Sequence, residues 1–211
     1  MPRGRLITIE GIDGSGKTTL ASGLLEALRA RVGEVELLRE PGGVVASERM
    51  RDLVKDPAVE LCDRAEALLY AAARAQLVSE RLVPLLEAGT WVVLDRFVDS
   101  SLAYQGAGRA LGIEAVRAIN LFATVGLEAD RTLLLRVDPA LGRARAAERG
   151  EAPDRLELED EEFFERIAAG YDALARAERV RVRVIDAGER PDRVLELALA
   201  ALVDLMPASA R

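Results

Sequence analysis

A glycine-rich segment near the N-terminus has the residue types and the spacing that bind phosphate. Residues 11–18, with the sequence GIDGSGKT, fit the pattern G-x-x-x-x-G-K-[ST]. In this pattern the backbone N–H groups surround an anion, the lysine (Lys17) contacts the β- and γ-phosphates, and the threonine hydroxyl (Thr18) binds Mg²⁺. The alternative interpretation is a flexible turn without a ligand.

The neighbouring segments favour the phosphate-binding interpretation. Such a loop needs a strand before it and a helix after it, so that the N-terminus of the helix points at the anion. Residues 6–10 (LITIE) have the apolar character of a short buried strand, and leucines recur at helical spacing over residues 18–31. Both neighbours are therefore predicted.

A second acidic residue is expected beside this loop. The apolar run Trp91–Leu94 predicts a buried strand, and Asp95 ends it. In a parallel sheet this carboxylate would lie at the same edge as the loop, where Mg²⁺ needs a further partner, directly or through water. A helix cap or a salt bridge is the alternative role of Asp95.

The order of elements predicts an α/β fold. Apolar strand-like segments alternate with helical patterns, which favours a parallel sheet with helices on both faces. The chain shows no linker and no internal repeat, so we expect one domain over residues 1–211. The charged stretch 143–162 is predicted to be a mobile insert. The predicted strands are 6–10, 35–38, 91–95, 133–138 and 180–186, and the clearest helices are 18–31, 47–54, 64–87 and 194–205.

Composition excludes several classes of protein. A formal net charge of −7 disfavours a general nucleic-acid or acidic-membrane binder. No histidine is present, which rules out Ser-His-Asp and Cys-His catalysis, and the single cysteine, Cys62, forms no internal disulfide. Apolar runs are far shorter than the roughly 20 residues that cross a bilayer. We expect no nucleic-acid or membrane partner and a cytoplasmic location.

GTPases of the Asn-Lys-x-Asp type are also disfavoured, because the only asparagine, Asn120, precedes a leucine.

Four separate blocks of sequence resemble the thymidylate kinases. They are residues 10–19 (EGIDGSGKTT), residues 39–43 (REPGG), residues 95–106 (DRFVDSSLAYQG) and the arginine-rich insert, in matching order and spacing. The resemblance implies a P-loop NTPase-type five-stranded parallel sheet with a short arginine-rich lid at about residues 143–158. It also implies transfer of the γ-phosphoryl group of ATP to dTMP, giving dTDP and ADP for dTTP synthesis, with Mg²⁺ and in a homodimer.

The same resemblance implies an acceptor site. The residue that matches Tyr70 stacks on thymine, usually as Phe, while those matching Arg74, Ser101 and Gln105 bind the base edge. Tyr70 and Arg74 are four residues apart, as are Ser101 and Gln105, so each pair would share one helix face. Without the resemblance, Tyr70 and Arg74 are typical of an ordinary amphipathic helix surface. The full dTMP-binding set is Asp13, Arg39, Glu40, Pro41, Arg51, Tyr70, Arg74, Arg96, Ser101, Tyr104 and Gln105.

Within this set, the arginines suit phosphate because planar guanidinium groups bind its oxygens in pairs. The implied roles are contact with the dTMP phosphate for Arg39, Arg51 and Arg96, and with the sugar for Tyr104. For Asp13 the resemblance implies contact with the 3′ side of the sugar or with the surroundings of the acceptor phosphate. The family often has a cis peptide before the residue matching Pro41.

The donor site implied by the resemblance consists of the loop and the lid. Some thymidylate kinases place an arginine where this chain has Gly14; this chain resembles those that supply it from the lid, with Arg149 and Arg155 as the best matches. Ion pairs with nearby acids are the alternative for these arginines. The ATP-binding set is Gly11, Ile12, Asp13, Gly14, Ser15, Gly16, Lys17, Thr18, Thr19, Arg145 and Ala187, the last two flanking adenine, and the catalytic set is Asp13, Lys17, Arg96, Arg149 and Arg155.

The predicted chemistry needs no general base. The second pKa of a phosphate monoester is about 6, so the acceptor is mostly a dianion at neutral pH and already a nucleophile. Cations must instead bring two anions together. Two alternatives to thymidylate kinase stay open: a kinase for another nucleoside monophosphate, and an inactive ATP-binding regulatory module of the same fold.

Overall fold

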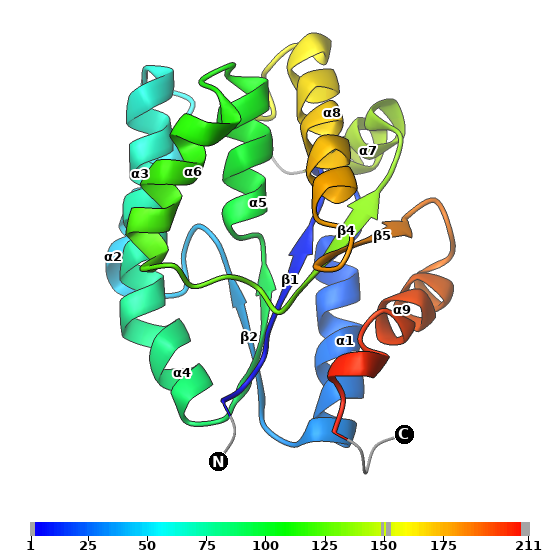
Figure 1. Ribbon diagram of the computed structural model, residues 1–211. Coiled ribbons are helices and arrows are strands. Elements are labelled where there is room, and N and C mark those ends of the chain that lie inside the picture. The colour runs from blue at the N-terminus through cyan, green and yellow to red at the C-terminus, as the bar shows by residue number, and fades with distance from the viewer. Residues whose placement is uncertain (1–2, 149, 151–152, 208–211) are drawn as a thin grey trace.

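The computed structural model describes residues 3–148, 150 and 153–207. Its centre is a parallel sheet of five strands in the order β2-β3-β1-β4-β5 (Figure 1). None of the described helices is long and apolar enough to cross a membrane. The strands are β1 Leu6–Glu10, β2 Val35–Arg39, β3 Trp91–Asp95, β4 Arg131–Arg136 and β5 Val182–Asp186.

Helices cover both faces of the sheet (Figure 1). α1 and α9 pack together on one face, while α3, α6 and α8 stand on the other. The α-helices are α1 Lys17–Val32, α2 Val45–Lys55, α3 Asp63–Leu77, α4 Val83–Glu87, α5 Val98–Ser101, α6 Ile113–Thr124, α7 Pro139–Ala147, α8 Glu161–Ala177 and α9 Pro191–Ala200. Two π-helical segments, η1 Val78–Leu82 and η2 Leu102–Gly108, and a 3₁₀ turn, η3 Val203–Leu205, complete the described elements.

The central strand shows why the core has two sides. Successive side chains of a strand point to opposite faces. Ile7 and Ile9 pack with α1 and α9, whereas Leu6 packs with α3, η1 and α4 on the opposite face. Glu10 follows the same alternation and faces α5 and α8, where two hydroxyl groups donate hydrogen bonds to its carboxylate. Both faces of β1 are buried, as expected for a parallel strand.

Strand β4 and the last helix differ from the sequence prediction. The strand occupies 131–136 rather than 133–138, because Asp138 caps α7 by accepting hydrogen bonds from the N–H groups of Ala140 and Leu141. The predicted helix over 194–205 ends at Ala200 and continues only as the 3₁₀ turn η3. The predicted strand 180–186 is shorter, at Val182–Asp186.

The helical regions were also predicted incompletely. The predicted helix 64–87 is continuous in the structure, but a π-helical segment lies within it between α3 and α4. The stretch 143–162, expected as one insert, begins inside α7 and ends inside α8. Helix α8 buries two phenylalanines, Phe163 and Phe164, so its first turn belongs to the core.

Candidate functional site

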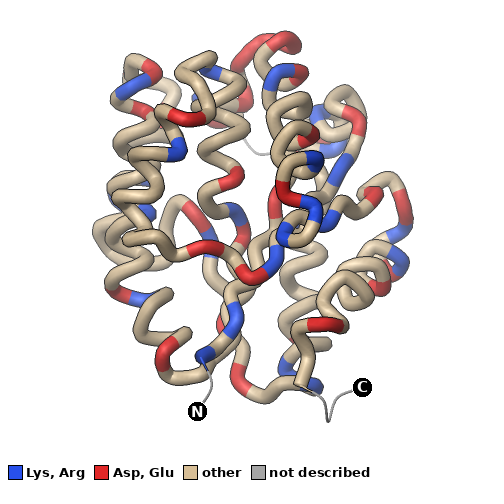
Figure 2. The backbone as a smooth tube through the Cα atoms, viewed as in Figure 1, with Lys and Arg blue, Asp and Glu red and all other residues tan. Residues whose placement is uncertain are grey.

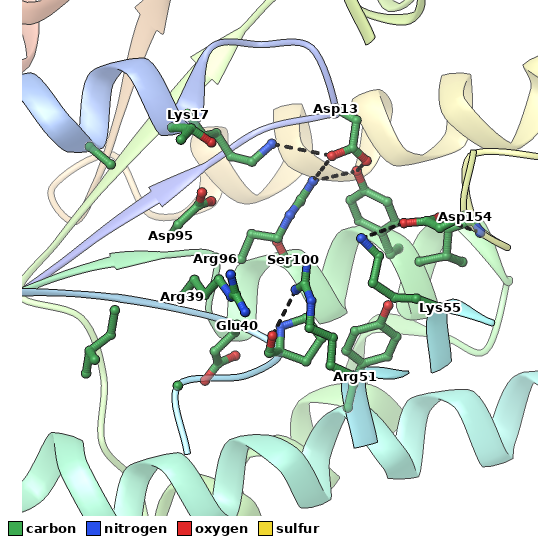
Figure 3. A pocket seen from close by; sticks show the side chains of 18 of the residues that line it. Asp13, Lys17, Arg39, Glu40, Arg51, Lys55, Asp95, Arg96, Ser100 and Asp154 are labelled. Carbon is green, nitrogen blue, oxygen red and sulfur yellow. Dashed lines mark hydrogen bonds and ion pairs between the residues drawn. The ribbon is translucent and has the colours of Figure 1, made fainter. Parts of the chain in front are cut away.

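A pocket of about 780 Å³ opens at the carboxyl edge of the sheet (Figure 3). Parallel strands end together there: Asp95 at the end of β3 lies in register with Ile9 of β1 and Arg39 of β2. Ligands of open parallel sheets bind at this edge. The pocket is lined by the phosphate loop, the β2–α2 turn, α3, the β3–α5 turn, η2, α7 and residues 154, 156 and 157.

Lys17 begins α1 and points back into the loop. Its Nζ donates hydrogen bonds to the backbone oxygens of Gly11 (3.2 Å) and Ile12 (2.9 Å), and lies 3.8 Å from Asp13 Oδ1. Burial, together with the charge of Arg96, lowers the pKa of Lys17 to about 8. A bound phosphate would supply the negative charge that stabilises the ammonium form.

Two glycines bring the loop against α7. An ideal Cβ on Gly14 would lie 1.9 Å from the backbone oxygen of Gly142, and one on Gly142 would lie 2.9 Å from the backbone oxygen of Asp13. Neither position has room for a side chain. An arginine at position 14 therefore does not fit in this structure.

Arg96 lies between the loop and the acceptor side of the pocket. Its backbone adopts a left-handed conformation (φ 69°), which strains a non-glycine residue by about 1–3 kcal/mol. The guanidinium donates to the backbone oxygen of Gly11 (3.1 Å), to Asp13 Oδ1 (2.7 Å) and to Ser100 Oγ (3.1 Å). It also lies over the ring of Tyr104, 5.0 Å from the centroid.

The charges around Asp13 keep it ionised. Burial by itself would raise the pKa of Asp13, but the positive charges of Arg96 and Lys17 outweigh it and hold the pKa well below its usual range. Tyr104 donates a further hydrogen bond to Asp13 Oδ2 (3.2 Å). Asp13 thus positions both cations of the donor side in this structure.

Glu10 supports the turn that carries Arg96. Its carboxylate accepts hydrogen bonds from the Phe97 N–H (2.7 Å), the Ser100 hydroxyl (2.5 Å) and the Tyr171 hydroxyl (3.0 Å). Burial, reinforced by nearby Asp99, raises the pKa of Glu10 to about 7. Glu10 belongs to the first resembling block, but no role was predicted for it.

The residues predicted to hold Mg²⁺ fit such an ion. Asp95 and Thr18 both line the pocket, and Asp95 Oδ1 is buried without a hydrogen-bond partner among the described residues. Oxygen ligands are those Mg²⁺ prefers. The described residues contain no cluster of three acidic, cysteine or histidine side chains that could hold a metal, so most ligands would be phosphate oxygens and water.

On the acceptor side, the predicted phosphate-binding arginines contact protein acceptors. Arg39 pairs with Glu48 at 3.0 Å, and Arg51 donates to the backbone oxygen of Pro41 at 2.9 Å. The Glu40–Pro41 peptide bond is cis, as the resemblance implied. In Figure 3, Arg39 and Arg51 lie near Glu40, whereas Arg96 points toward Asp13.

Arg74 is buried at the end expected to hold the base. An arginine has five N–H donors. Here two contact Glu40 (2.7 and 2.6 Å), one contacts Ser101 Oγ (2.9 Å), one contacts Asn120 Oδ1, and one contacts the backbone oxygen of Phe97 (2.9 Å). In this structure Arg74 thus contacts protein acceptors, and its predicted contact with the base edge stays a prediction.

Two buried acceptors in the same region have no partner among the described residues: Gln105 Oε1 and Glu40 Oε1. Burial raises the pKa of Glu40 although Arg74 opposes the shift. Tyr70 lines the pocket one helical turn before Arg74, as its predicted stacking role requires. The unpartnered oxygens favour a ligand that brings N–H or O–H donors.

On the predicted adenine side, Arg145 and Ala187 are in direct contact. Arg145 Nη1 donates to the backbone oxygen of Ala187 at 2.9 Å. The structure thus brings the two residues together, but leaves no base-sized gap between them. An adenine ring held as predicted would have to separate them.

The lid residues are placed only in part. Arg149 lies outside the described residues. Arg155 donates to Glu66 Oε2 (2.6 Å) and to the backbone oxygen of Val54 (3.1 Å), so it contacts α3 and α2 rather than the phosphate loop. Its role over the transferred phosphoryl group stays a prediction.

Most predicted site residues meet in the one pocket. Those that do not line it are Gly11, Ile12 and Ser15 in the loop, and Ala187 and Arg155 beyond it. The predicted residues that line the pocket are Asp13, Gly14, Gly16, Lys17, Thr18, Thr19, Arg39, Glu40, Pro41, Arg51, Tyr70, Arg74, Asp95, Arg96, Ser101, Tyr104, Gln105 and Arg145.

Two pocket residues, Lys55 and Asp154, were not predicted from the sequence. Both line the pocket, and their side chains form an ion pair of 2.8 Å that joins the end of α2 to the segment before α8 (Figure 3). One signal was available: Lys17 and Lys55 are the only lysines of a chain that otherwise uses arginine. Both now prove to line the same pocket.

Comparison with known proteins shows the family of this chain. The sequence model of the family described as thymidylate kinase matches residues 9–197. A thymidylate kinase of Deinococcus radiodurans is 50% identical over 96% of this chain and 98% of its own length, and one of Lactobacillus delbrueckii subsp. bulgaricus is 45% identical over 97% and 98%. The crystal structure of thymidylate kinase from Ehrlichia chaffeensis superimposes with a TM-score of 0.77 at 30% identity, covering 95% of this chain and 99% of that one. The chain therefore belongs to the thymidylate kinase family.

Proposed function

We propose that this pocket transfers the γ-phosphoryl group of ATP to dTMP, giving ADP and dTDP. The observation that carries the proposal is the position of Arg96, which contacts the phosphate loop through Gly11 and Asp13 and the acceptor side through Ser100. One cation therefore lies where a donor and an acceptor phosphate would meet. The chain is an enzyme of the transferase class, and ATP is its expected donor.

The donor end rests on the loop that begins α1. Backbone N–H groups of residues 13–18 and the N-terminus of α1 would surround the β- and γ-phosphates, with Lys17 leaving its backbone acceptors for phosphate oxygens. Thr18 and Asp95 would hold Mg²⁺, which supplies positive charge to the β- and γ-oxygens. Arg145 would lie against the adenine.

The acceptor end rests on β2, α3 and η2. Tyr70 would stack on the base, and Ser101 and Gln105 would meet its edge. Arg39, Arg51 and Arg96 would bind the phosphate of dTMP, each exchanging a protein acceptor for a phosphate oxygen. Tyr104, beside Asp13, would face the sugar.

The reaction itself is a displacement at phosphorus. An oxygen of the dTMP phosphate dianion attacks the γ-phosphorus, the bond from the γ-phosphorus to the β–γ bridging oxygen breaks, and ADP keeps that electron pair. No side chain has to remove a proton, because the attacking oxygen carries none. Arg96 and Lys17 stabilise the negative charge that the two substrates bring together.

An assay of ADP release with ATP, Mg²⁺ and individual nucleoside monophosphates tests this function. Selective turnover of dTMP over dUMP, UMP and AMP is the expected outcome. Preference for another monophosphate would keep the kinase chemistry but reject the assignment of the base pocket. No turnover with any of them would contradict catalysis and favour a regulatory module.

We also infer that two copies associate through α3 and α6. These helices pack together, and they expose large apolar side chains: Leu68 at 56%, Leu121 at 60%, Phe122 at 88% and Val125 at 90%. Figure 2 shows this end of α6 without charged residues, in agreement with the uncharged sequence 118–127. A patch of this kind favours association between copies.

Two further expectations belong to the same proposal. Residues 1–211 act as one catalytic domain in which residues 143–158 form the lid, supported by the packing of α9 near the C-terminus against α1. The enzyme works in the cytoplasm, where the single cysteine, Cys62, remains a free thiol.

A further inference from the structure

The side chain of Glu66 is fully buried between the base pocket and the segment before α8. It belongs to the same face of α3 as Tyr70 and Arg74, at intervals of four residues. Its Oε2 accepts hydrogen bonds from Arg109 (3.0 Å) and Arg155 (2.6 Å). Its Oε1 accepts one from Gln105 Nε2 (2.8 Å) and a longer one from Arg109 Nε (3.4 Å).

The contact between Glu66 and Gln105 decides how the Gln105 amide is oriented. A carboxylate between two guanidinium groups offers only acceptors, so the amide must turn its NH₂ group toward Glu66. The amide oxygen, Gln105 Oε1, is then directed away from Glu66. It is buried, it has no partner among the described residues, and Gln105 lines the pocket.

We propose that Glu66 is a positioning residue that fixes the Gln105 amide with its oxygen toward the base, and so makes the site prefer a base whose edge donates N–H. The inference rests on the proposed function of this pocket. Thymine carries a hydrogen on N3 and can donate to Gln105 Oε1. Cytosine has a lone pair at N3, which would face the amide oxygen and leave two acceptors opposed.

The contacts of the two carboxylate oxygens predict how Glu66→Gln changes the orientation of the Gln105 amide. The shortest contacts of both arginines are with Oε2 (3.0 and 2.6 Å), whereas Arg109 Nε lies 3.4 Å from Oε1. The new amide therefore keeps its oxygen at the Oε2 position and places its NH₂ group at the Oε1 position. Gln105 then accepts from that NH₂ group and turns its own NH₂ toward the pocket. The group that Gln105 presents to the base thus changes from a hydrogen-bond acceptor to a hydrogen-bond donor.

The test compares kcat/KM for dTMP with kcat/KM for dCMP at saturating ATP. The ratio cancels effects that both acceptors share, such as altered lid closure or a smaller folded fraction. We expect Glu66→Gln to lower the dTMP-to-dCMP ratio by about ten- to a hundredfold, mainly through a higher KM for dTMP.

Arg109→Gln is the matched control. It removes one of the two arginines from Glu66 but leaves the carboxylate that accepts from Gln105, so the ratio should stay within about twofold of wild type even if the protein becomes less stable. A purely structural role of Glu66 predicts the same ratio in both variants, and that result would overturn the proposal.

The remaining outcomes are also decisive. If Glu66→Gln does not fold, Glu66→Asp replaces it; its shorter side chain cannot hold Gln105 and both arginines at these distances, and an unchanged ratio would overturn the proposal. Absence of dTMP turnover by the wild-type enzyme would reject the proposed function itself. Turnover by wild type with an unchanged ratio in the variant would reject only the role of Glu66.

Discussion

The ammonium group of Lys17 lies deep in the phosphate loop, where backbone oxygens accept its hydrogen bonds. Desolvation there favours the neutral amine, and the neighbouring charge of Arg96 adds to the effect, so the pKa falls to about 8. Only the ammonium form can attract phosphate. The protonation of this one residue should therefore govern how the free enzyme captures ATP.

A pH profile checks this consequence. Deprotonation proceeds as the pH rises through about 8, so kcat/KM for ATP should fall about tenfold per pH unit above that value. The profile of kcat should stay level to higher pH, because bound phosphates keep Lys17 charged. Lys17→Ala should lower kcat by about 10²-fold or more and lose the step near pH 8. A wild-type kcat/KM that is constant from pH 7 to 10 would contradict the assignment.

Tyr70 offers a second test at the scale of one residue. Tyr70→Ala removes the ring that is proposed to stack on the base, and should raise KM for dTMP about tenfold while leaving KM for ATP unchanged. Tyr70→Phe is the control, since it keeps the ring and should behave like wild type. Equal loss with both variants would instead assign the role to the hydroxyl group.

At the scale of elements, the phosphate loop and α7 are in close backbone contact at Gly14 and Gly142. The contact is backbone to backbone, so a single methyl group on either glycine cannot be accommodated without moving α7. The segment that carries Arg145 is thus held against the segment that begins the phosphate site. Sequence spacing predicts the loop but not this contact, because its partner is more than 120 residues away.

Gly14→Ala tests this contact, and Gly150→Ala is its control. The φ angles are +76° and +70°, but a Cβ on Gly150 would meet nothing within 4 Å among the described residues. Gly150→Ala should cost only the strain of the left-handed conformation, about 1–2 kcal/mol, or about 2–8 °C in Tm. Gly14→Ala should lower Tm by clearly more and weaken ATP binding. Equal shifts in Tm would show that the contact with α7 contributes nothing.

Local patterns predicted the elements near the site better than those far from it. The strand before the loop and the strand ending at Asp95 were predicted with the observed bounds, because each is a short apolar run that ends in an acid. Strand β4 was predicted two residues late, since it begins with Arg131 and Thr132. These polar residues are buried and donate hydrogen bonds to Asp204 and Asp99, which only the fold brings near.

The same limit applies to the candidate site. Residues with a motif around them, such as Lys17 and Arg96, were identified from sequence, whereas Lys55, Glu66 and Asp154 were not. Each of the three acts through a partner from another element: Lys55 pairs with Asp154, and Glu66 joins Arg109, Arg155 and Gln105. No spacing rule predicts such pairs.

For the molecule as a whole, the exposed apolar patch of Leu68, Leu121, Phe122 and Val125 has no packing partner within the described part of the single chain. Phe122 and Val125 are almost entirely exposed at the C-terminal end of α6. Association of two copies would bury them. Figure 1 shows these helices on the side of the molecule away from α1 and α9, so a partner here would leave that face of the sheet untouched.

Phe122→Glu should therefore convert a dimer into a monomer at micromolar concentration, as measured by light scattering after gel filtration. The charge would be buried without a partner in the interface but tolerated in the free chain. Val180→Glu is the control: Val180 is 81% exposed but lies between α8 and β5. A wild-type monomer, or a dimer that survives Phe122→Glu, would contradict the proposed interface.

The cations of the pocket are all engaged before any nucleotide arrives: Lys17 with loop carbonyls, Arg39 with Glu48, Arg51 with Pro41, and Arg96 with Asp13. A phosphate that binds must replace the protein oxygen that already accepts a hydrogen bond from each cation. When the phosphate dissociates, the same protein oxygen can accept that hydrogen bond again. We therefore expect binding to change the number of hydrogen bonds little, which favours moderate affinity and ready release of products. Such an arrangement suits repeated turnover better than retention of nucleotides.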